Sequence, residues 1–262
     1  MKLPVALTIA GSDSGGGAGI QADLKTFAAL GVHGTSAITA ITAQNTLGVS
    51  DILELPVGLV VAQIEAVIED IGVQAAKTGM LSSSAIIEAV TEAVARHGIE
   101  RLVVDPVMVA KGGARLLRED AVEALRKRLL PLAAVITPNL PEVEVLLGRP
   151  VRSLEERRQA ARDLVAMGAR AAIVKGGHAE TDVTDVFWDG LRLAELEGER
   201  IPTANTHGSG CVFSAAIAAG LAKGLDPLAA AKEAKVFIQG AIANALEIGR
   251  GHGPVNPMFG RR

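Results

Sequence analysis

Six residues late in the chain combine a thiol with glycines at the expected start of a helix. Residues 206–211 are Thr-His-Gly-Ser-Gly-Cys, and a run of small residues follows at 212–222. Backbone N–H groups at a helix N-terminus stabilise negative charge, so Gly208 and Gly210 are candidates for an anion hole around a transferring phosphoryl group. The helix end is also expected to lower the pKa of Cys211 below about 8.5, so that its thiolate acts as a base. A structural cysteine beside a glycine-rich cap explains the residues equally well, so both interpretations stay open.

A second glycine-rich stretch follows the first apolar run. Residues 11–19 are Gly-Ser-Asp-Ser-Gly-Gly-Gly-Ala-Gly, between an expected strand and an expected helix. Glycines let the backbone approach a ligand closely, and the start of a helix favours an anion. The spacing matches neither a P-loop nor the dinucleotide-binding pattern, so a flexible turn is the alternative.

Carboxylates follow two other expected strands. Asp105 ends one strand, and Glu142 follows another within the sequence Asn-Leu-Pro-Glu that begins at Asn139. Mg²⁺ prefers one or two carboxylates together with water and phosphate oxygens, so Asp105 and Glu142 are candidate metal ligands. The alternative for Glu142 is the first turn of a helix, which favours a carboxylate and tolerates Pro141.

Two more polar residues end expected strands, and each has an ordinary alternative. Lys175 begins Lys-Gly-Gly-His and is a candidate contact for nucleotide phosphates, or simply the exit from a strand. The amide of Gln44 can pair with both a ring nitrogen and an amino group, although a lone Gln is more often a surface residue. Lys77-Thr78 resembles the end of a P-loop but lacks its glycine spacing, so it is assigned no role.

Short apolar runs alternate with helical patterns along the chain. Strands are expected at 5–10, 35–42, 101–105, 133–137 and 170–175, and a β-hairpin at 183–196. Helices are expected at 18–30, 56–71, 84–96, 210–222 and 227–246, with the serines at 82–84 as caps of the third. This alternation predicts an α/β fold with a mostly parallel central sheet and helices on both faces. Ligands bind at the carboxyl ends of parallel strands, so the polar residues above are expected to meet there.

The composition narrows the class of protein. With 49% hydrophobic and 21% charged residues, the 262-residue chain has an ordinary globular composition, and no linker or repeat divides it. We therefore expect residues 1–262 to form a single domain. A net charge of -3 and only 2% aromatic residues argue against binding to nucleic acid or membranes. One cysteine excludes an internal disulfide, and the short first apolar run predicts a buried strand, which together favour a cytoplasmic location.

Seven motifs follow one another along the chain. They are Ala-Gly-Ser-Asp-Ser-Gly-Gly-Gly-Ala-Gly-Ile-Gln-Ala-Asp-Leu-Lys at 10–25, Lys-Thr-Gly-Met at 77–80, Asp-Pro-Val-Met-Val-Ala-Lys at 105–111, Thr-Pro-Asn-Leu-Pro-Glu at 137–142, Val-Lys-Gly-Gly-His at 174–178, Thr-His-Gly-Ser-Gly-Cys at 206–211 and Gly-His-Gly-Pro-Val at 251–255. In this order they resemble the bifunctional hydroxymethylpyrimidine/phosphomethylpyrimidine kinases of thiamine biosynthesis, a group of the ribokinase-like superfamily. The resemblance spans essentially the whole chain.

The resemblance implies a reaction and a ribokinase-like fold with small β-hairpin elements. An ATP-dependent kinase, with Mg²⁺ as cofactor, would phosphorylate 4-amino-5-hydroxymethyl-2-methylpyrimidine and then its monophosphate. Gln44 would recognise the aminopyrimidine, while Gly11, Asp23 and Met80 would help to form the substrate pocket. Relatives are often dimers, so a homodimer is expected, and the segment 109–116 is a candidate to close over the site.

The resemblance also implies roles at the phosphate end of the site. Asn139 and Glu142 match the superfamily's N-x-x-E element, which organises Mg²⁺ and phosphates. Lys175 falls in the nucleotide-side motif. The remaining matches are to the anion hole and the catalytic base, which are Gly208, Gly210 and Cys211.

Departures from the pattern and rival functions are few. Gly15 stands where relatives usually have Ser, and Pro257 stands where the tail often has His. A pyridoxal kinase is the nearest alternative, because one branch of that group also carries the cysteine. A sugar kinase would be expected to have Asp at position 211, and a non-catalytic sensor of thiamine precursors is the alternative from another class.

Overall fold

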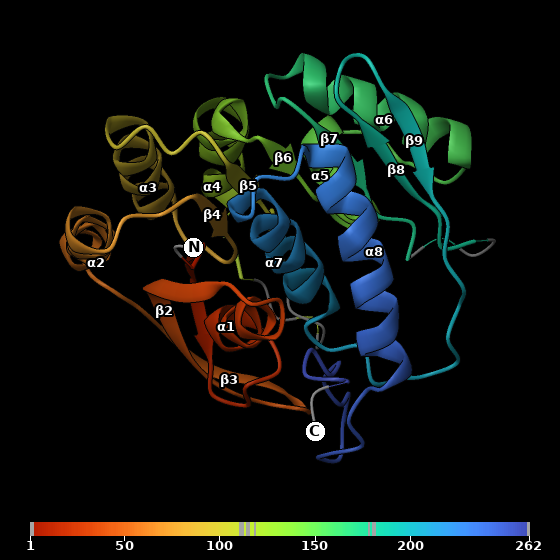
Figure 1. Ribbon diagram of the computed structural model, residues 1–262, viewed down its shortest axis with the longest axis horizontal. Coiled ribbons are helices and arrows are strands. Elements are labelled where there is room, and N and C mark those ends of the chain that lie inside the picture. Colours follow the sequence, from red (N-terminus) through yellow and green to blue (C-terminus); the bar gives the residue numbers. More distant parts are fainter. Residues whose placement is uncertain are drawn as a thin grey trace.

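The apolar runs of the chain form one nine-stranded sheet, which Figure 1 shows in the computed structural model. The structure describes residues 3–109, 113, 116, 117, 119–177, 179 and 182–260. Lys111, His178 and most of the segment 109–116 lie outside the described residues. The strands are β1 (Val5–Asp13), β2 (His33–Asn45), β3 (Gly48–Glu54), β4 (Ala75–Thr78), β5 (Leu102–Val104), β6 (Val135–Ile136), β7 (Ala172–Val174), β8 (Asp185–Trp188) and β9 (Leu193–Leu196).

The order of the strands confirms a mostly parallel sheet. Across the sheet the order is β3-β2-β1-β4-β5-β6-β7-β8-β9, and β2 to β7 in this row are parallel to one another. Antiparallel strands lie only at the two edges: β3 pairs with β2, and β8 and β9 form the expected hairpin. The carboxyl ends of the central strands therefore lie along one edge, as the sequence predicted.

Helices cover both faces of the sheet, as expected (Figure 1). They are α1 (Gly19–Ala29), α2 (Val57–Asp70), α3 (Ser84–Arg96), α4 (Glu119–Ala124), α5 (Leu140–Leu147), α6 (Leu154–Ala166), α7 (Ser209–Ala222) and α8 (Pro227–Ala243). A π turn (Leu125–Leu129) and a 3-10 turn (Leu130–Leu132) extend α4. Among the described residues, no helix has the length and apolar character needed to span a membrane.

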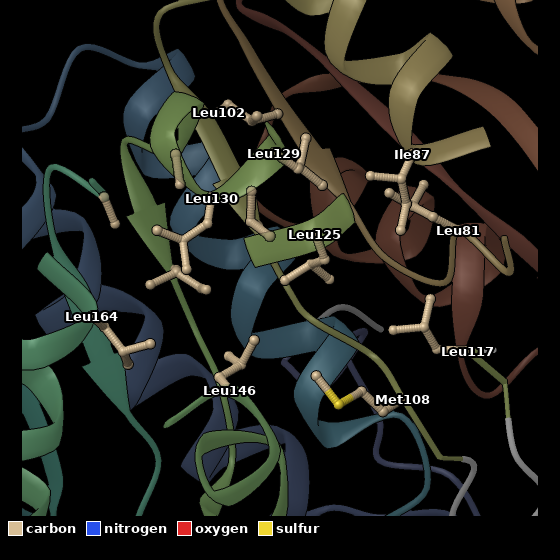
Figure 2. Packing of buried hydrophobic residues seen from close by; sticks show 14 of the residues in the cluster. Leu81, Ile87, Leu102, Met108, Leu117, Leu125, Leu129, Leu130, Leu146 and Leu164 are labelled. Atoms are coloured by element: carbon tan, nitrogen blue, oxygen red, sulfur yellow. The ribbon is translucent and has the colours of Figure 1, made fainter. Parts of the chain in front are cut away.

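The two faces have separate cores because side chains alternate along each strand. On β1, Leu7 and Ile9 pack with α2 to α6, whereas Ala6 packs with α1, α7 and α8. Figure 2 shows part of the first core, where Leu102 of β5 lies beside Leu129 of the π turn. Almost all of α7 is buried, which explains its run of small residues.

Two local expectations were wrong. No strand was expected at β3, which pairs with β2 along the edge of the sheet. The serines before α3 do not cap it: Ser83 is the N-cap residue but makes no side-chain cap bond. The hydroxyls of Ser82 and Ser83 instead donate to the Glu54 carboxylate at 2.7 and 3.0 Å, which ties the start of α3 to the end of β3.

Candidate active site

A cavity of about 820 Å³ lies at the carboxyl ends of the parallel strands. Residues from the glycine-rich loop, from the strand ends and from the starts of α5 and α7 border it. Of the candidates from the sequence, those on its wall are Gly11, Gln44, Met80, Asp105, Asn139, Glu142, Lys175, Gly208, Gly210 and Cys211. The expected meeting of these residues at one edge therefore occurs. Their chemical roles remain predictions.

Asp23 does not border the cavity and lies beneath it. Its carboxylate is fully buried, where it accepts a hydrogen bond from Thr8 at 2.6 Å and forms an ion pair with Lys77 at 2.9 Å. We therefore find no geometric support for direct contact between Asp23 and a substrate. Lys77, to which the sequence assigned no role, borders the cavity in its place. Burial alone would lower the pKa of Lys77, but the negative charge of Asp23 raises it, so this lysine stays charged.

The start of α7 is built on close contact with the glycine-rich loop. Gly208, the N-cap residue, has φ of 77°, and a Cβ there would overlap the carbonyl oxygen of Gly17. Only glycine fits such a position without strain. The first N–H groups of a helix lack partners within it. The Ser209 N–H donates to the carbonyl oxygen of Thr206 at 3.2 Å, so the amides of Gly210 and Cys211, which border the cavity, are the candidate donors to an anion.

Cys211 lies in the first turn of α7, half-buried at the cavity wall. Its sulfur accepts a hydrogen bond from the N–H of Gly19 at the start of α1. We expected the helix end to lower the thiol pKa, and this was wrong. Burial raises the pKa of Cys211 to about 11, since loss of water outweighs the charge of Lys77 and the bond from Gly19. The thiol is therefore protonated at neutral pH.

Asp13 organises the glycine-rich loop. Its carboxylate accepts backbone N–H bonds from Gly15 and Ala18, both at 2.8 Å, and its Oδ2 lies 2.9 Å from Nε2 of His207. Burial alone would raise the pKa of Asp13, but the bond to His207 and the backbone amides hold it below its ordinary value. Asp13 and His207 thus join two motifs that lie far apart in the sequence, a link that sequence reasoning missed.

Gln44, near the end of β2, also borders the cavity. The amide oxygen accepts a hydrogen bond from Thr42 at 3.0 Å, and Nε2 lies 3.4 Å from Nε2 of His207. A carboxamide offers both a donor and an acceptor, so it can recognise a ligand with a ring nitrogen beside an amino group. Near Gln44, a Cβ added to Gly11 would lie 3.1 Å from Sδ of Met80, so these residues leave little space between them.

A second ion pair lies under the start of α7. Nζ of Lys175 is 3.2 Å from Oδ1 of Asp105, and Ser214 donates to Oδ2 of the same carboxylate at 3.1 Å. Burial would raise the pKa of Asp105, but the charges of Lys175 and Lys77 lower it, so the carboxylate is ionised at neutral pH. A Cβ on Gly210 would lie 3.3 Å from Nζ of Lys175, which places this cation beside the candidate anion hole.

Asn139 and Glu142 form a reciprocal cap at the start of α5. The Asn139 side chain accepts from the Glu142 N–H at 2.9 Å, and Oε2 of Glu142 accepts from the Asn139 N–H at 2.8 Å. The structural alternative for Glu142 is therefore correct, yet the residue also borders the cavity. Burial and the charge of Asp105 raise the pKa of Glu142 to about 7, against the opposing charge of Lys175.

The part of the cavity lining that includes α8 was not foreseen. Ile238 and Ile242 of α8 border it, together with Lys235 and Gln239 of the same helix. The other lining residues from this part of the chain are also mixed: Val183, Asp185, Glu199, Arg200, Ile201 and Thr203. Apolar side chains for a flat ring and polar side chains for its substituents are therefore both present, and none of these residues belongs to a motif that was used to locate the site.

Comparison with known proteins gives consistent matches over almost the whole chain. Residues 13–256 match the model of a family described as phosphomethylpyrimidine kinase. A hydroxymethylpyrimidine/phosphomethylpyrimidine kinase of Bacillus subtilis (strain 168) is 50% identical over 264 residues, covering 100% of this chain and 97% of the relative.

Solved structures agree in fold. Phosphomethylpyrimidine kinase from Clostridium difficile 630 is 42% identical, with a TM-score of 0.83 over 92% of this chain and 100% of the other. The pyridoxal kinase from Staphylococcus aureus, in complex with AMP-PCP and pyridoxal, is 38% identical, with a TM-score of 0.91 over 100% of this chain and 96% of the other.

Proposed function

The chain belongs to the phosphomethylpyrimidine kinase family, and we propose that the cavity between Gln44 and the start of α7 is where it phosphorylates an aminopyrimidine alcohol. The protein is a hydroxymethylpyrimidine/phosphomethylpyrimidine kinase of thiamine biosynthesis, with a ribokinase-like fold. It transfers a phosphoryl group from ATP to 4-amino-5-hydroxymethyl-2-methylpyrimidine and then to the resulting monophosphate. The observation that carries the site assignment is that the Gln44 amide and the start of α7 border one cavity of about 820 Å³.

Gln44 positions the pyrimidine. Its amide pairs with a ring nitrogen and with the neighbouring amino group, which a simple alcohol or sugar does not offer together. The hydroxymethyl group then lies toward Cys211, and Gly11 and Met80 bound the ring, since all three residues border the same cavity. Asp23 contributes from beneath, through Lys77, rather than by contact with the substrate.

The start of α7 holds the phosphates. Amides near Gly208 and Gly210 stabilise the charge that develops on the transferring group, and Lys175 adds a fixed positive charge beside them. Asn139 fixes the start of α5 through its reciprocal cap with Glu142. The adenine ring of ATP packs against Ile238 and Ile242 of α8, which border the cavity.

Mg²⁺ fits the carboxylates present. Of the five carboxylates that border the cavity, Asp105 and Glu142 follow the central strands, whereas the other three are Asp13, Asp185 and Glu199. The described residues contain no group of three or more His, Cys, Asp or Glu side chains placed to hold a metal ion. Mg²⁺ completes its shell with water and phosphate oxygens, which suits Glu142 and Asp105. A nearby cation also relieves the cost of ionising Glu142, whose pKa burial raises to about 7. When bound, the ion neutralises charge on the triphosphate.

Proton transfer differs between the two steps. In the first, the hydroxyl oxygen attacks the γ-phosphorus, the bond to the β,γ-bridging oxygen breaks, and the thiolate of Cys211 accepts the hydroxyl proton. In the second, the acceptor is a phosphate that is already ionised, so it does not need this base. Cys211 therefore matters chiefly for the hydroxyl step.

Pyridoxal phosphorylation is the second candidate activity. The pyridoxal kinase of Staphylococcus aureus has nearly the same fold, with a TM-score of 0.91, so the fold does not separate the two substrates. The separating feature is Gln44, because pyridoxal has no amino group beside its ring nitrogen. We therefore place pyridoxal as a side substrate at most.

Turnover of ATP with hydroxymethylpyrimidine, its monophosphate and pyridoxal, measured side by side, tests this assignment. We expect efficient turnover with both pyrimidines and weak turnover with pyridoxal. Gln44→Leu keeps the side-chain size and should raise KM for the pyrimidine at least tenfold, since two hydrogen bonds are lost. Pyridoxal turnover in this variant serves as the internal control, and preference for pyridoxal by the wild type would contradict the assignment.

Three coarser expectations accompany this proposal. One sheet runs through the described parts of the chain, which supports treating residues 1–262 as a single kinase domain. A homodimer and a cytoplasmic location stay predictions; the first is tested by light scattering and the second by cell fractionation.

A further inference from the structure

Lys77 is a fully buried lysine whose role the reaction above does not explain. It lies on β4 with 0% of its surface exposed, and it borders the cavity. Its ammonium pairs with both carboxylate oxygens of Asp23, at 2.9 and 3.2 Å, and Thr8 donates to that carboxylate. Removing two charges from water costs several kcal/mol per ion, so a buried pair is a poor means of stabilising a fold. The pair therefore calls for a functional explanation.

The ammonium extends toward the carboxyl end of its strand. A Cβ added to Gly79 would lie 2.8 Å from Nζ of Lys77, so the side chain runs along β4 past Thr78 and toward the cavity. α7 packs against β4 on this face of the sheet (Figure 1). Lys77 and Cys211, which lies on α7, therefore border the same cavity.

Charged groups from four elements act on the sulfur of Cys211. Asp23 on α1 and Asp105 after β5 oppose its negative form, while Lys77 on β4 favours it, together with the N–H of Gly19. Lys175, after β7, also interacts with the sulfur. Among the charged groups, Lys77 has the largest effect on Cys211.

We propose that Lys77 is a positioning residue for phosphoryl transfer: held by Asp23 and Thr8, its ammonium stabilises negative charge on the sulfur of Cys211. This inference rests on the proposed role of Cys211 as the base. In the hydroxyl step the proton passes from the substrate oxygen to the sulfur, the new O–P bond forms and ADP leaves. Lys77 keeps its three protons throughout and lowers the energy of the thiolate that must exist before that transfer.

The single cysteine makes this inference testable on the whole protein. The chain has one Cys and no Tyr, so alkylation by iodoacetamide and the ultraviolet absorbance of a thiolate both report Cys211 alone. We expect Lys77→Met to slow alkylation about tenfold or more between pH 7 and 9.5, because one pKa unit changes the thiolate fraction tenfold. The absorbance midpoint should move to higher pH. A lysine that only supported the fold would give the opposite result, since loosening the site exposes the thiol and speeds alkylation.

A second variant covers the case in which Lys77→Met does not fold with Asp23 left unpaired. The double variant Lys77→Met/Asp23→Asn has two neutral side chains of similar size, and slower alkylation is again expected because Lys77 outweighs Asp23. The matched control is Lys235→Met/Asp185→Asn, which removes another buried Lys–Asp pair, 2.8 Å apart, between α8 and β8. Its alkylation rate should stay within twofold of the wild type.

Alkylation of Lys77→Met/Asp23→Asn at the wild-type rate or faster would overturn the inference. These measurements need no substrate, so they separate this inference from the proposed function. If the wild-type protein turned over neither pyrimidine, the proposed function would be contradicted. The alkylation rate of Cys211 would still test the role of Lys77. Normal turnover of the pyrimidines, together with an alkylation rate of Cys211 that the Lys77 variants leave unchanged, would overturn only the proposed role of Lys77.

Discussion

At the scale of single residues, the protonation of Cys211 sets the expected pH dependence. With a pKa of about 11, on the order of one molecule in ten thousand carries a thiolate at pH 7, and each further pH unit raises that fraction tenfold. In a loose phosphoryl-transfer transition state the hydroxyl proton leaves late. A small fraction of Cys211 thiolate is therefore compatible with a slow rate of turnover. The burial that raises the pKa also makes the thiolate, once formed, a strong base.

Cys211→Ala should therefore affect the two phosphorylations differently. We expect the rate of the first phosphorylation by the wild type to rise with pH from 7 to 10, and this rise to disappear in the variant. The second phosphorylation should change by less than the first, because its phosphate acceptor is already ionised. Rates with each acceptor, followed by ADP release, check this. Equal loss in both steps would contradict the role of Cys211 as the base for the hydroxyl.

The buried carboxyl group of Glu142 is expected to destabilise the folded protein while it serves the kinase reaction. Its folded-state pKa is about 7, above the ordinary value, so the folded protein holds a proton that the unfolded chain loses near pH 4.5. Folding is therefore penalised increasingly as pH rises from about 4.5 to 7, and the penalty stays constant above that. Glu142→Gln stays neutral and keeps an oxygen for the cap with Asn139.

The expected result for Glu142→Gln is greater thermal stability than the wild type at pH 8 and no difference at pH 4.5, without ligand. The gain is limited by about 1.4 kcal/mol per pKa unit. Kinase activity should fall, since a carboxylate is lost beside the triphosphate. Thermal unfolding at the two pH values measures the gain, and a gain that is equal at both would refute the pKa explanation.

Motifs located most residues of the site, but not the links between them. Asn139, Glu142, Lys175 and the residues around Cys211 border the cavity as their places after strands or before a helix suggested. The pairs Lys77–Asp23 and His207–Asp13 were missed, because their members lie 54 and 194 residues apart in the sequence. Such pairing depends on how strands and helices meet, which no local pattern records. The pKa of Cys211 was mispredicted for the same reason, since burial is a property of the whole fold.

At the scale of elements, the start of α7 depends on one glycine. A side chain at Gly208 would need a left-handed conformation, costing about 1–2 kcal/mol, and would displace the glycine-rich loop at Gly17. Gly208→Ala should therefore lower both stability and kinase activity, the latter by at least a hundredfold. Thermal unfolding and ATP turnover measure the two effects.

Gly224, just past the other end of α7, supplies the matched control. It also has a positive φ, of 93°, but a Cβ there meets nothing within 4 Å. Gly224→Ala should lose similar stability from backbone strain while keeping its activity. If both variants lost activity alike, strain in α7 rather than contact with the glycine-rich loop would be the cause.

Most elements with a clear apolar pattern were predicted, although no strand was predicted at β4 and no helix at α6, both of which contain buried residues. α1, α2 and α3 start and end within two residues of their expected positions because their apolar spacing marks a buried stripe. In β3, by contrast, every residue is exposed or half-buried, so its sequence carries no signal of alternate burial. It is a strand because β2 extends beyond the core and offers it a partner.

At the scale of the whole molecule, the two edges of the sheet differ. The β2–β3 edge lies far from the β8–β9 edge in Figure 1, and it exposes apolar side chains. Ile41 and Leu53 lie opposite each other across β2 and β3, and 46% and 65% of their surfaces are exposed. Paired exposed apolar side chains on an edge strand favour contact with another chain, and a second copy is the partner that the expected homodimer supplies.

Leu53→Glu is therefore expected to convert a homodimer into a monomer, because a symmetric interface would bring two carboxylates into an apolar contact. Light scattering at micromolar concentration measures the mass of each form. Leu191→Glu is the matched control: Leu191 is 91% exposed but lies in the turn between β8 and β9, so its variant should remain dimeric. A monomeric wild type would contradict the homodimer, whereas dissociation of the Leu191 variant alone would place the interface at the opposite edge of the sheet. Gln44 lies one residue before the end of the same β2 strand. A monomeric Leu53→Glu protein with unchanged KM for the pyrimidine would then show that each active site is complete within one chain.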